Sequence, residues 1–135
     1  MGEVQFKDKL TPEQYRVLRE KGTEPPHSGE LLHEERDGTF SCAACGNEVF
    51  SSEAKYESTT PGLIGWPSFN KAKADGSVVE QPDSSIGMKR TEVVCTNCDS
   101  HLGHVFPEDA SISGTGQHYC INSLALDFKE NDTNG

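Results

Sequence analysis

Residues 95–106 read CTNCDSHLGHVF, so a Cys-x-x-Cys pair directly precedes two histidines and a short apolar run. A second pair lies at residues 42–45 and is followed by Gly46, which tolerates the positive φ that a tight turn often needs. Two such pairs suit a tetrahedral four-cysteine zinc site, because each turn supplies two thiolates. The long gap between the pairs predicts that the fold brings two strand ends together, rather than forming a small finger.

The expected metal is one structural Zn²⁺ per chain, because four protein ligands leave no position for water or substrate. Buried reduced cysteines and redox dithiols remain as alternative interpretations. Redox Cys-x-x-Cys motifs usually come singly and open a helix, so the paired spacing favours zinc. The four expected ligands are Cys42, Cys45, Cys95 and Cys98.

The composition describes an acidic chain of 135 residues with 33% hydrophobic residues and a net charge of −10. This length predicts one domain. After Arg90, Lys129 is the one basic residue against seven acids, which argues against a protein that tracks nucleic-acid phosphates. No segment approaches the ~20 apolar residues of a membrane span. The odd cysteine count and the lack of a signal-peptide pattern predict a cytoplasmic protein, and we expect a monomer.

Local patterns predict a mainly β domain with one or two short helices at its N-terminal end. Thr11-Pro12-Glu13-Gln14 has the residues of a capped helix start, and Lys21-Gly22 is expected to end that helix. Asp37-Gly38 and Asp75-Gly76 are hairpin signals. Strands are predicted at residues 87–95, 101–106 and, most strongly, 117–128. The expected division is an N-terminal arm (1–9), one domain (10–128) and a flexible tail (129–135).

The fifth cysteine, Cys120, lies on the strongest predicted strand. Strand periodicity puts Asn122 on the same face, and Leu124, Leu126 and Phe128 continue that face inward. A lone cysteine of this kind is more often a small buried hydrophobe. A catalytic role for Cys120 is favoured because His101, His104 and Trp66 could converge on it. Thiolate chemistry needs such partners.

Several motifs together resemble the B-type methionine sulfoxide reductases, which reduce the R epimer of methionine sulfoxide. The resemblance covers roughly residues 8–128 in the family's order. It is carried by residues 10–15 (LTPEQY), 42–46 (CAACG), 65–69 (GWPSF), 87–93 (GMKRTEV), 95–106 (CTNCDSHLGHVF) and 119–123 (YCINS).

The resemblance implies two antiparallel sheets with short helices, and a Cys₄ zinc site away from the catalytic centre. It implies that Cys120 is the nucleophile and that Trp66 holds the methyl group of the substrate. Phe69 and Phe106 are expected beside the substrate. The polar side of the pocket, which holds and protonates the sulfoxide oxygen, is expected to comprise His101, His104 and Asn122, with His104 as the preferred proton donor.

Two positions depart from the family pattern. The family usually has Arg-Tyr-Cys at its nucleophile, and this chain has His118-Tyr119-Cys120. The usual resolving cysteine before Gly-Trp-Pro-Ser-Phe is replaced by Ile64. The sequence therefore predicts a one-cysteine cycle that is completed by an external reductant, either thioredoxin or a small thiol.

Two other functions remain as alternatives. A non-enzymatic zinc-bearing β module could bind a partner protein, but it would not need Cys120, His101, His104 and Trp66 together. A different thiol enzyme, such as a peroxide reductase, would require a thiol lined by cations and would not need a tryptophan beside it.

Overall fold

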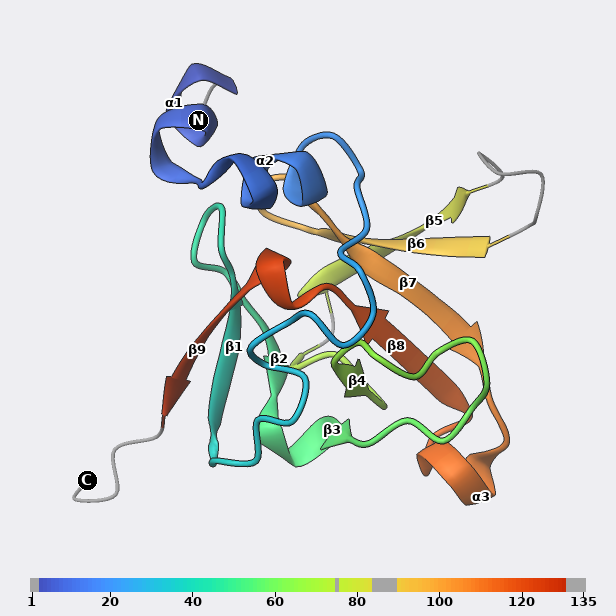
Figure 1. The fold of residues 1–135 in the computed structure, drawn as a ribbon. Coiled ribbons are helices and arrows are strands. Elements are labelled where there is room, and N and C mark those ends of the chain that lie inside the picture. Colours follow the sequence, from blue (N-terminus) through green and yellow to red (C-terminus); the bar gives the residue numbers. More distant parts are fainter. Residues whose placement is uncertain (1–2, 75, 84–89, 131–135) are drawn as a thin grey trace.

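The computed structural model describes residues 3–74, 76–83 and 90–130, and these form two antiparallel sheets with short helices (Figure 1). The predicted fold class is thereby confirmed. The helices and 3₁₀ turns are α1 (Glu3–Lys9), α2 (Pro12–Leu18), η1 (Ser52–Ala54), α3 (Ala110–Ser113) and η2 (Ser123–Ala125). The strands are β1 (Gly38–Cys42), β2 (Glu48–Ser51), β3 (Lys55–Tyr56), β4 (Ser68–Phe69), β5 (Val78–Asp83), β6 (Arg90–Cys95), β7 (His101–Pro107), β8 (Gln117–Ile121) and β9 (Leu126–Glu130).

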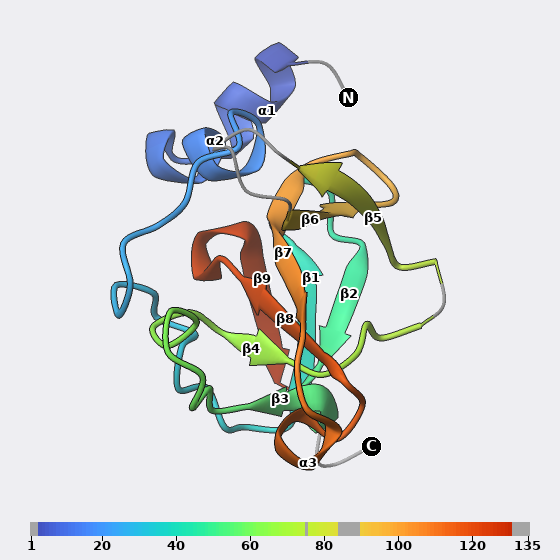
Figure 2. The same ribbon diagram turned by 90° about the vertical axis from the view of Figure 1, so that its right-hand side faces the viewer.

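The smaller sheet has the strand order β2-β1-β9, and the larger has the order β3-β4-β8-β7-β6-β5. Figure 2 shows β7 and β8 of the larger sheet passing in front of β1 and β2. The core lies between them and is aromatic. The Phe69 ring from the larger sheet stacks on Phe50 at 4.4 Å and meets Phe40 edge-on at 5.0 Å, both from the smaller sheet. All three side chains are fully buried, so these aromatic contacts join the two sheets.

The predicted helix start at Thr11 is confirmed. The Thr11 side chain accepts a hydrogen bond from the Gln14 amide, and the Gln14 side chain accepts one from the Thr11 amide, which completes a capping box. Helix α2 ends at Leu18, slightly before the expected Lys21-Gly22 end. Residues 1–9 were expected to be an arm. Helix α1 occupies most of that range and packs on the domain, with Phe6 2% exposed.

Two strand predictions were wrong. Residues 117–128 do not form one strand, because η2 interrupts them and sends β8 and β9 into different sheets. Asp37-Gly38 does not close a hairpin, since the chain before it forms turns and β1 begins at Gly38.

Other predictions fall partly outside the described residues. Strand β6 confirms positions 90–95 of the strand predicted at 87–95, whereas 87–89 are not described. Asp75 of the second hairpin signal and residues 131–135 of the tail also lie outside them. Among the described residues, no helix is both long enough and apolar enough to cross a membrane.

Candidate active site and metal centre

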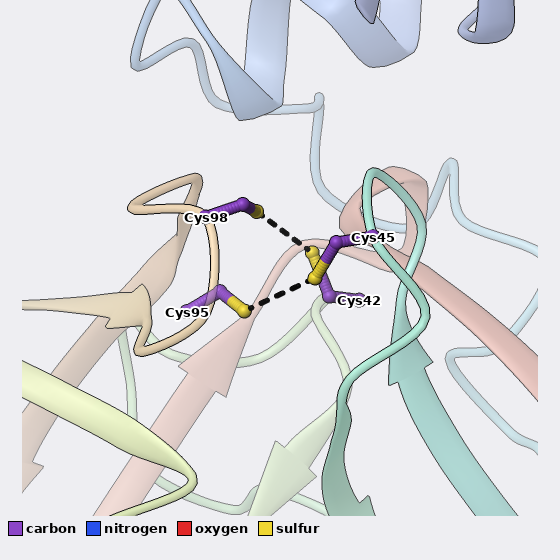
Figure 3. A group of neighbouring side chains, drawn as sticks. All are labelled: Cys42, Cys45, Cys95 and Cys98. Atoms are coloured by element: carbon purple, nitrogen blue, oxygen red, sulfur yellow. Dashed lines mark hydrogen bonds between the residues drawn. The ribbon is translucent and has the colours of Figure 1, made fainter. Parts of the chain in front are cut away.

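The four cysteines of the two Cys-x-x-Cys pairs meet in space, as predicted (Figure 3). The first pair forms the turn between β1 and β2, and the second forms the turn between β6 and β7. In each turn the amide after the second cysteine donates to the carbonyl of the first, from Gly46 to Cys42 and from Asp99 to Cys95, at 2.8 Å in both cases. Gly46 has φ +84°, as expected, and Asp99 at the equivalent position of the second turn also has a positive φ, of +60°.

The sulfur positions fit a tetrahedral zinc ion. All four lie within 4.8 Å of one another, and two pairs of sulfurs lie 3.7 Å and 3.6 Å apart. A tetrahedron with Zn–S bonds of ~2.3 Å has edges of about 3.8 Å. A hydrogen bond from Cys42 lowers the pKa of Cys95 to about 5, which favours a thiolate in the cluster. The four-cysteine cluster can therefore hold a metal ion, and its donor set suits zinc.

The two N-terminal helices hold the cysteine turns in place. Lys9 at the end of α1 donates to the Ala44 carbonyl at 2.9 Å, and Arg19 after α2 donates to the Cys98 carbonyl at 2.8 Å. None of the four cysteines lines the pocket beside Cys120.

Cys120 lies in the middle of the larger sheet, where β8 runs between β4 and β7. Its register partners are Ser68 on β4 and His104 on β7. The half-buried thiol lines a pocket of about 100 Å³. This volume suits the end of one unbranched side chain rather than a cofactor, since ligand pockets for larger molecules span ~300–1,000 Å³.

Trp66, His104, Phe106 and Asn122 line the same pocket, so the structure brings together most of the predicted site. Trp66 is half-buried, and its indole Nε1 donates to the Glu24 carbonyl at 2.9 Å. The Asn122 amide donates one N–H to the Leu102 carbonyl at 3.0 Å. Its second N–H stays available for an oxygen in the pocket.

His101 and Phe69 do not line this pocket. His101 is buried one layer behind it, with Nδ1 at 2.8 Å from Glu92, and its ring meets His104 edge-on at 5.3 Å. Its ring contact with His104 connects it to a residue that lines the pocket. Phe69 is fully buried in the core, where it cannot contact a substrate in the pocket.

His104 is oriented by an acid that the motifs did not single out. Asp83 lies 2.8 Å from His104 Nε2 and also accepts from the Arg90 guanidinium at 3.1 Å. Arg90 itself lines the pocket and brings a permanent positive charge to it. Arg90 lies within the 87–93 motif, so the sequence did point to this segment. The motif did not indicate a role for Arg90 itself.

The structure also shows the surroundings of His118, which stands where the family usually has arginine. His118 is fully buried, with Nδ1 at 2.7 Å from Glu108 and Nε2 at 2.8 Å from Ser68 Oγ. Burial alone would raise the pKa of Glu108, but hydrogen bonds from His118, Thr60 and Tyr56 bring it below its ordinary value. His118 thus pairs with a carboxylate behind β4 and does not line the pocket.

The thiol of Cys120 is protonated in the free protein near neutral pH. Burial raises its pKa to about 12, with the negative charge of Glu24 as a second contribution. The site therefore needs a route that moves the thiol proton when the thiol reacts.

Comparisons with known proteins agree with this arrangement. The family model described as the SelR domain matches residues 10–130. A relative from Methanosarcina mazei, named peptide methionine sulfoxide reductase MsrB, is 53% identical over 97% of this chain and 90% of its own length. The human methionine-R-sulfoxide reductase B2, mitochondrial, is 46% identical over 96% of this chain and 71% of its own length.

A solved structure gives the same fold at lower identity. The Mis18 "Yippee-like" domain covers 73% of this chain and all of its own chain, with a TM-score of 0.55 and 19% identity, which shows likeness of fold alone. The SelR match spans nearly the whole described chain, and the relatives align over its full site. The chain therefore belongs to the SelR domain family.

Proposed function

We propose that this protein is an oxidoreductase that reduces methionine-R-sulfoxide, free or within peptides and proteins, to methionine. The observation that carries the proposal is the shared pocket of Cys120, Trp66, His104 and Asn122. The names of the relatives support the activity, and the name of the human relative supports the R epimer. These names favour an enzyme over a non-enzymatic zinc module.

The direct test compares the two epimers. The protein should consume methionine-R-sulfoxide with dithiothreitol as the reductant and should leave the S epimer unchanged. Equal turnover of both epimers, or of neither, would contradict the proposal.

In the proposed reaction, Cys120 Sγ attacks the sulfoxide sulfur while the sulfoxide oxygen is protonated. The protonated oxygen is then transferred as a hydroxyl group from the substrate sulfur to Cys120 Sγ. The substrate S–O bond and the transient S–S bond break, an S–O bond forms on Cys120, and the products are methionine and a sulfenic acid on Cys120. The methionine sulfur is reduced and the cysteine sulfur is oxidised, and the number of protons is unchanged. Trp66 and Phe106 supply the apolar wall for the methyl group, and Asn122 offers its free N–H to the oxygen.

His104 is the proposed proton donor, because it lines the pocket and Asp83 fixes its ring. We expect His104→Ala to lower kcat/KM by about 10²–10⁴-fold, the usual contribution of general acid catalysis. The measurement is steady-state kinetics on the R epimer, with a thermal melt as the control for folding. A loss smaller than about tenfold would place the donor elsewhere. His101 is assigned to supporting His104 through their ring contact.

The raised pKa of Cys120 predicts how the thiol reacts with an alkylating agent. Because only the thiolate reacts, its rate with iodoacetamide should rise about tenfold per pH unit from pH ~7 to ~10 without a plateau. Mass spectrometry of the alkylated protein measures this rate, and Cys120→Ser gives the background from the other cysteines. A plateau below pH ~9 would show that the thiol is activated in the free protein.

We further propose that the four-cysteine cluster holds one structural Zn²⁺, as its closed donor set and its distance from the pocket residues suggest. A reductant must then come from outside the chain. Ile64, at the usual resolving position, is 44% exposed and has no redox chemistry. Thioredoxin or a small thiol would attack the sulfenic acid, release water and form a mixed disulfide, which a second thiol opens.

The acidic segment after Arg90 disfavours anionic glutathione as that thiol. A monomer in the cytoplasm, where thiols stay reduced, suits this cycle. We propose no nucleic-acid or membrane partner.

A single turnover without reductant tests the one-cysteine cycle. After one equivalent of sulfoxide, intact-protein mass spectrometry and thiol trapping should find one added oxygen on Cys120 and zinc still bound. A disulfide between Cys120 and a cysteine of the cluster, with release of zinc, would contradict this cycle and make the metal site part of it.

A further inference from the structure

Glu24 is a buried acid that the reaction above does not use. It lies in the segment between α2 and β1, directly before Pro25-Pro26, and it is 1% exposed. In Figures 1 and 2 this segment, coloured blue to cyan, runs along one face of the molecule beside the turn that joins β8 to β9. Burying a carboxyl group is costly unless its oxygens are satisfied, so its position calls for a physical reason.

The backbone of Glu24 bridges two side chains of the pocket that are 56 residues apart in the sequence. Its N–H donates to Asn122 Oδ1 at 3.1 Å, and its carbonyl accepts from Trp66 Nε1 at 2.9 Å. Each contact uses a polar group of a side chain that lines the pocket. The position of the Glu24 backbone therefore sets the orientation of both the apolar wall and the polar wall.

The carboxyl group of Glu24 fixes this backbone to η2. Its Oε1 accepts from the Leu124 amide in η2 at 2.8 Å. Its Oε2 is buried and has no hydrogen-bond partner among the described residues. Burial raises the pKa of Glu24, partly offset by the amides of Leu124 and Ser123.

The close packing around the Glu24 carboxyl and η2 leaves little room for either to move. A Cβ at Gly29 would lie 2.7 Å from Glu24 Oε2 and 2.3 Å from Ser123 Cβ, so only glycine allows the carboxyl and η2 to approach so closely. Another link joins residues 24–27 to the loop that carries Trp66, because the His27 amide donates to the Gly65 carbonyl at 2.8 Å. The loop that carries Trp66 is thus held against residues 24–27.

We propose that Glu24 is a positioning residue for sulfoxide reduction, and that the reach of its side chain to η2 holds Trp66 and Asn122 in the geometry that binds the substrate. This rests on the proposed function. Small displacements of binding groups can cost about 10²-fold in rate, so a loss of this anchor should be measurable.

Two conservative variants separate the reach of the side chain from its charge. Glu24→Asp keeps the charge but is one methylene too short to reach the Leu124 amide. Glu24→Gln keeps the length and an acceptor oxygen but removes the charge. The exposed Glu20 provides a matched control, Glu20→Asp, with the same shortening on the surface.

Trp66 is the one tryptophan of the chain, so intrinsic fluorescence reports on it alone. We expect Glu24→Asp to shift the Trp66 emission to longer wavelength, to increase acrylamide quenching and to lower kcat/KM about tenfold or more, mainly through KM. Glu24→Gln and Glu20→Asp should retain the wild-type emission and kcat/KM within about threefold. Thermal melts and zinc content confirm that each variant is folded.

An effect of Glu24→Gln as large as that of Glu24→Asp, or wild-type emission and kinetics in both variants, would overturn the proposal. The fluorescence comparison does not need turnover. If the wild-type protein failed to reduce sulfoxide, the proposed function would fail while the emission data still tested the role of Glu24.

Discussion

The Cys120→Ser variant is expected to lose sulfoxide reductase activity by at least about 10⁴-fold, while its fold and metal content stay unchanged. Loss of a nucleophile is among the most severe single changes in an enzyme, because the remaining groups of the site act through it. A hydroxyl in place of the thiol cannot take up the oxygen as a sulfenic acid. The substitution is nearly isosteric and lies in the pocket, outside the aromatic core, so stability should change little.

Turnover of methionine-R-sulfoxide with dithiothreitol measures this loss, and the zinc content and thermal melt of the same sample show that the protein is folded. Substantial turnover by Cys120→Ser would remove Cys120 from the reaction. The matched comparison is serine substitution at Cys98, because that cysteine is half-buried like Cys120 but belongs to the metal cluster.

Substitution of a cluster cysteine, such as Cys98→Ser, should abolish stable folding rather than chemistry alone. Binding of a structural zinc contributes on the order of 10 kcal/mol at neutral pH, which is comparable to the whole stability of a small domain. The cluster joins β1 of the smaller sheet to β6 of the larger sheet, so the loss of the metal separates the two sheets at that end.

Metal analysis of the purified protein should find one zinc per chain, and a strong chelator should lower the midpoint of thermal unfolding steeply. Cys120→Ser is the control and should retain its zinc. A well-folded protein with no bound metal, or a Cys98→Ser variant with wild-type stability, would contradict the structural role of the cluster.

The capped helix and the two cysteine turns, which depend on local chemistry, agree with the structure. The capping box at Thr11 and Gln14 involves residues three apart, so the sequence pattern specifies its hydrogen bonds. The cysteine turns are equally local, because the bond from Gly46 to Cys42 forms within five residues. Their pairing into one cluster was also predictable, since a thiolate pair needs a second pair to complete a tetrahedral site.

The positions of the two histidines could not be read from their spacing. Residues three apart on a regular strand point to opposite faces. A register shift between β6 and β7 changes this parity near Val93 and Val94, so that the rings of His101 and His104 come within 5.3 Å. Only the pairing of β7 with its neighbours decides that His104 enters the pocket and that His101 turns to Glu92.

The sequence by itself determined the β fold class, the capped helix, the cysteine cluster and half of the residues that line the Cys120 pocket, because short-range patterns and specific motifs encode these features. Tertiary structure alone decided that residues 117–128 split between two sheets, that Phe69 belongs to the core and that Glu24 joins Trp66 to Asn122. Leu124, Leu126 and Phe128 continue one apolar face from η2 into β9, so the hydrophobic pattern alone does not mark the break. The contact that holds η2, from the Leu124 amide to Glu24, spans 100 residues of sequence. No local pattern pairs the segment of Glu24 with the segment of Leu124. Only the packed tertiary structure brings these two hydrogen-bonding groups together.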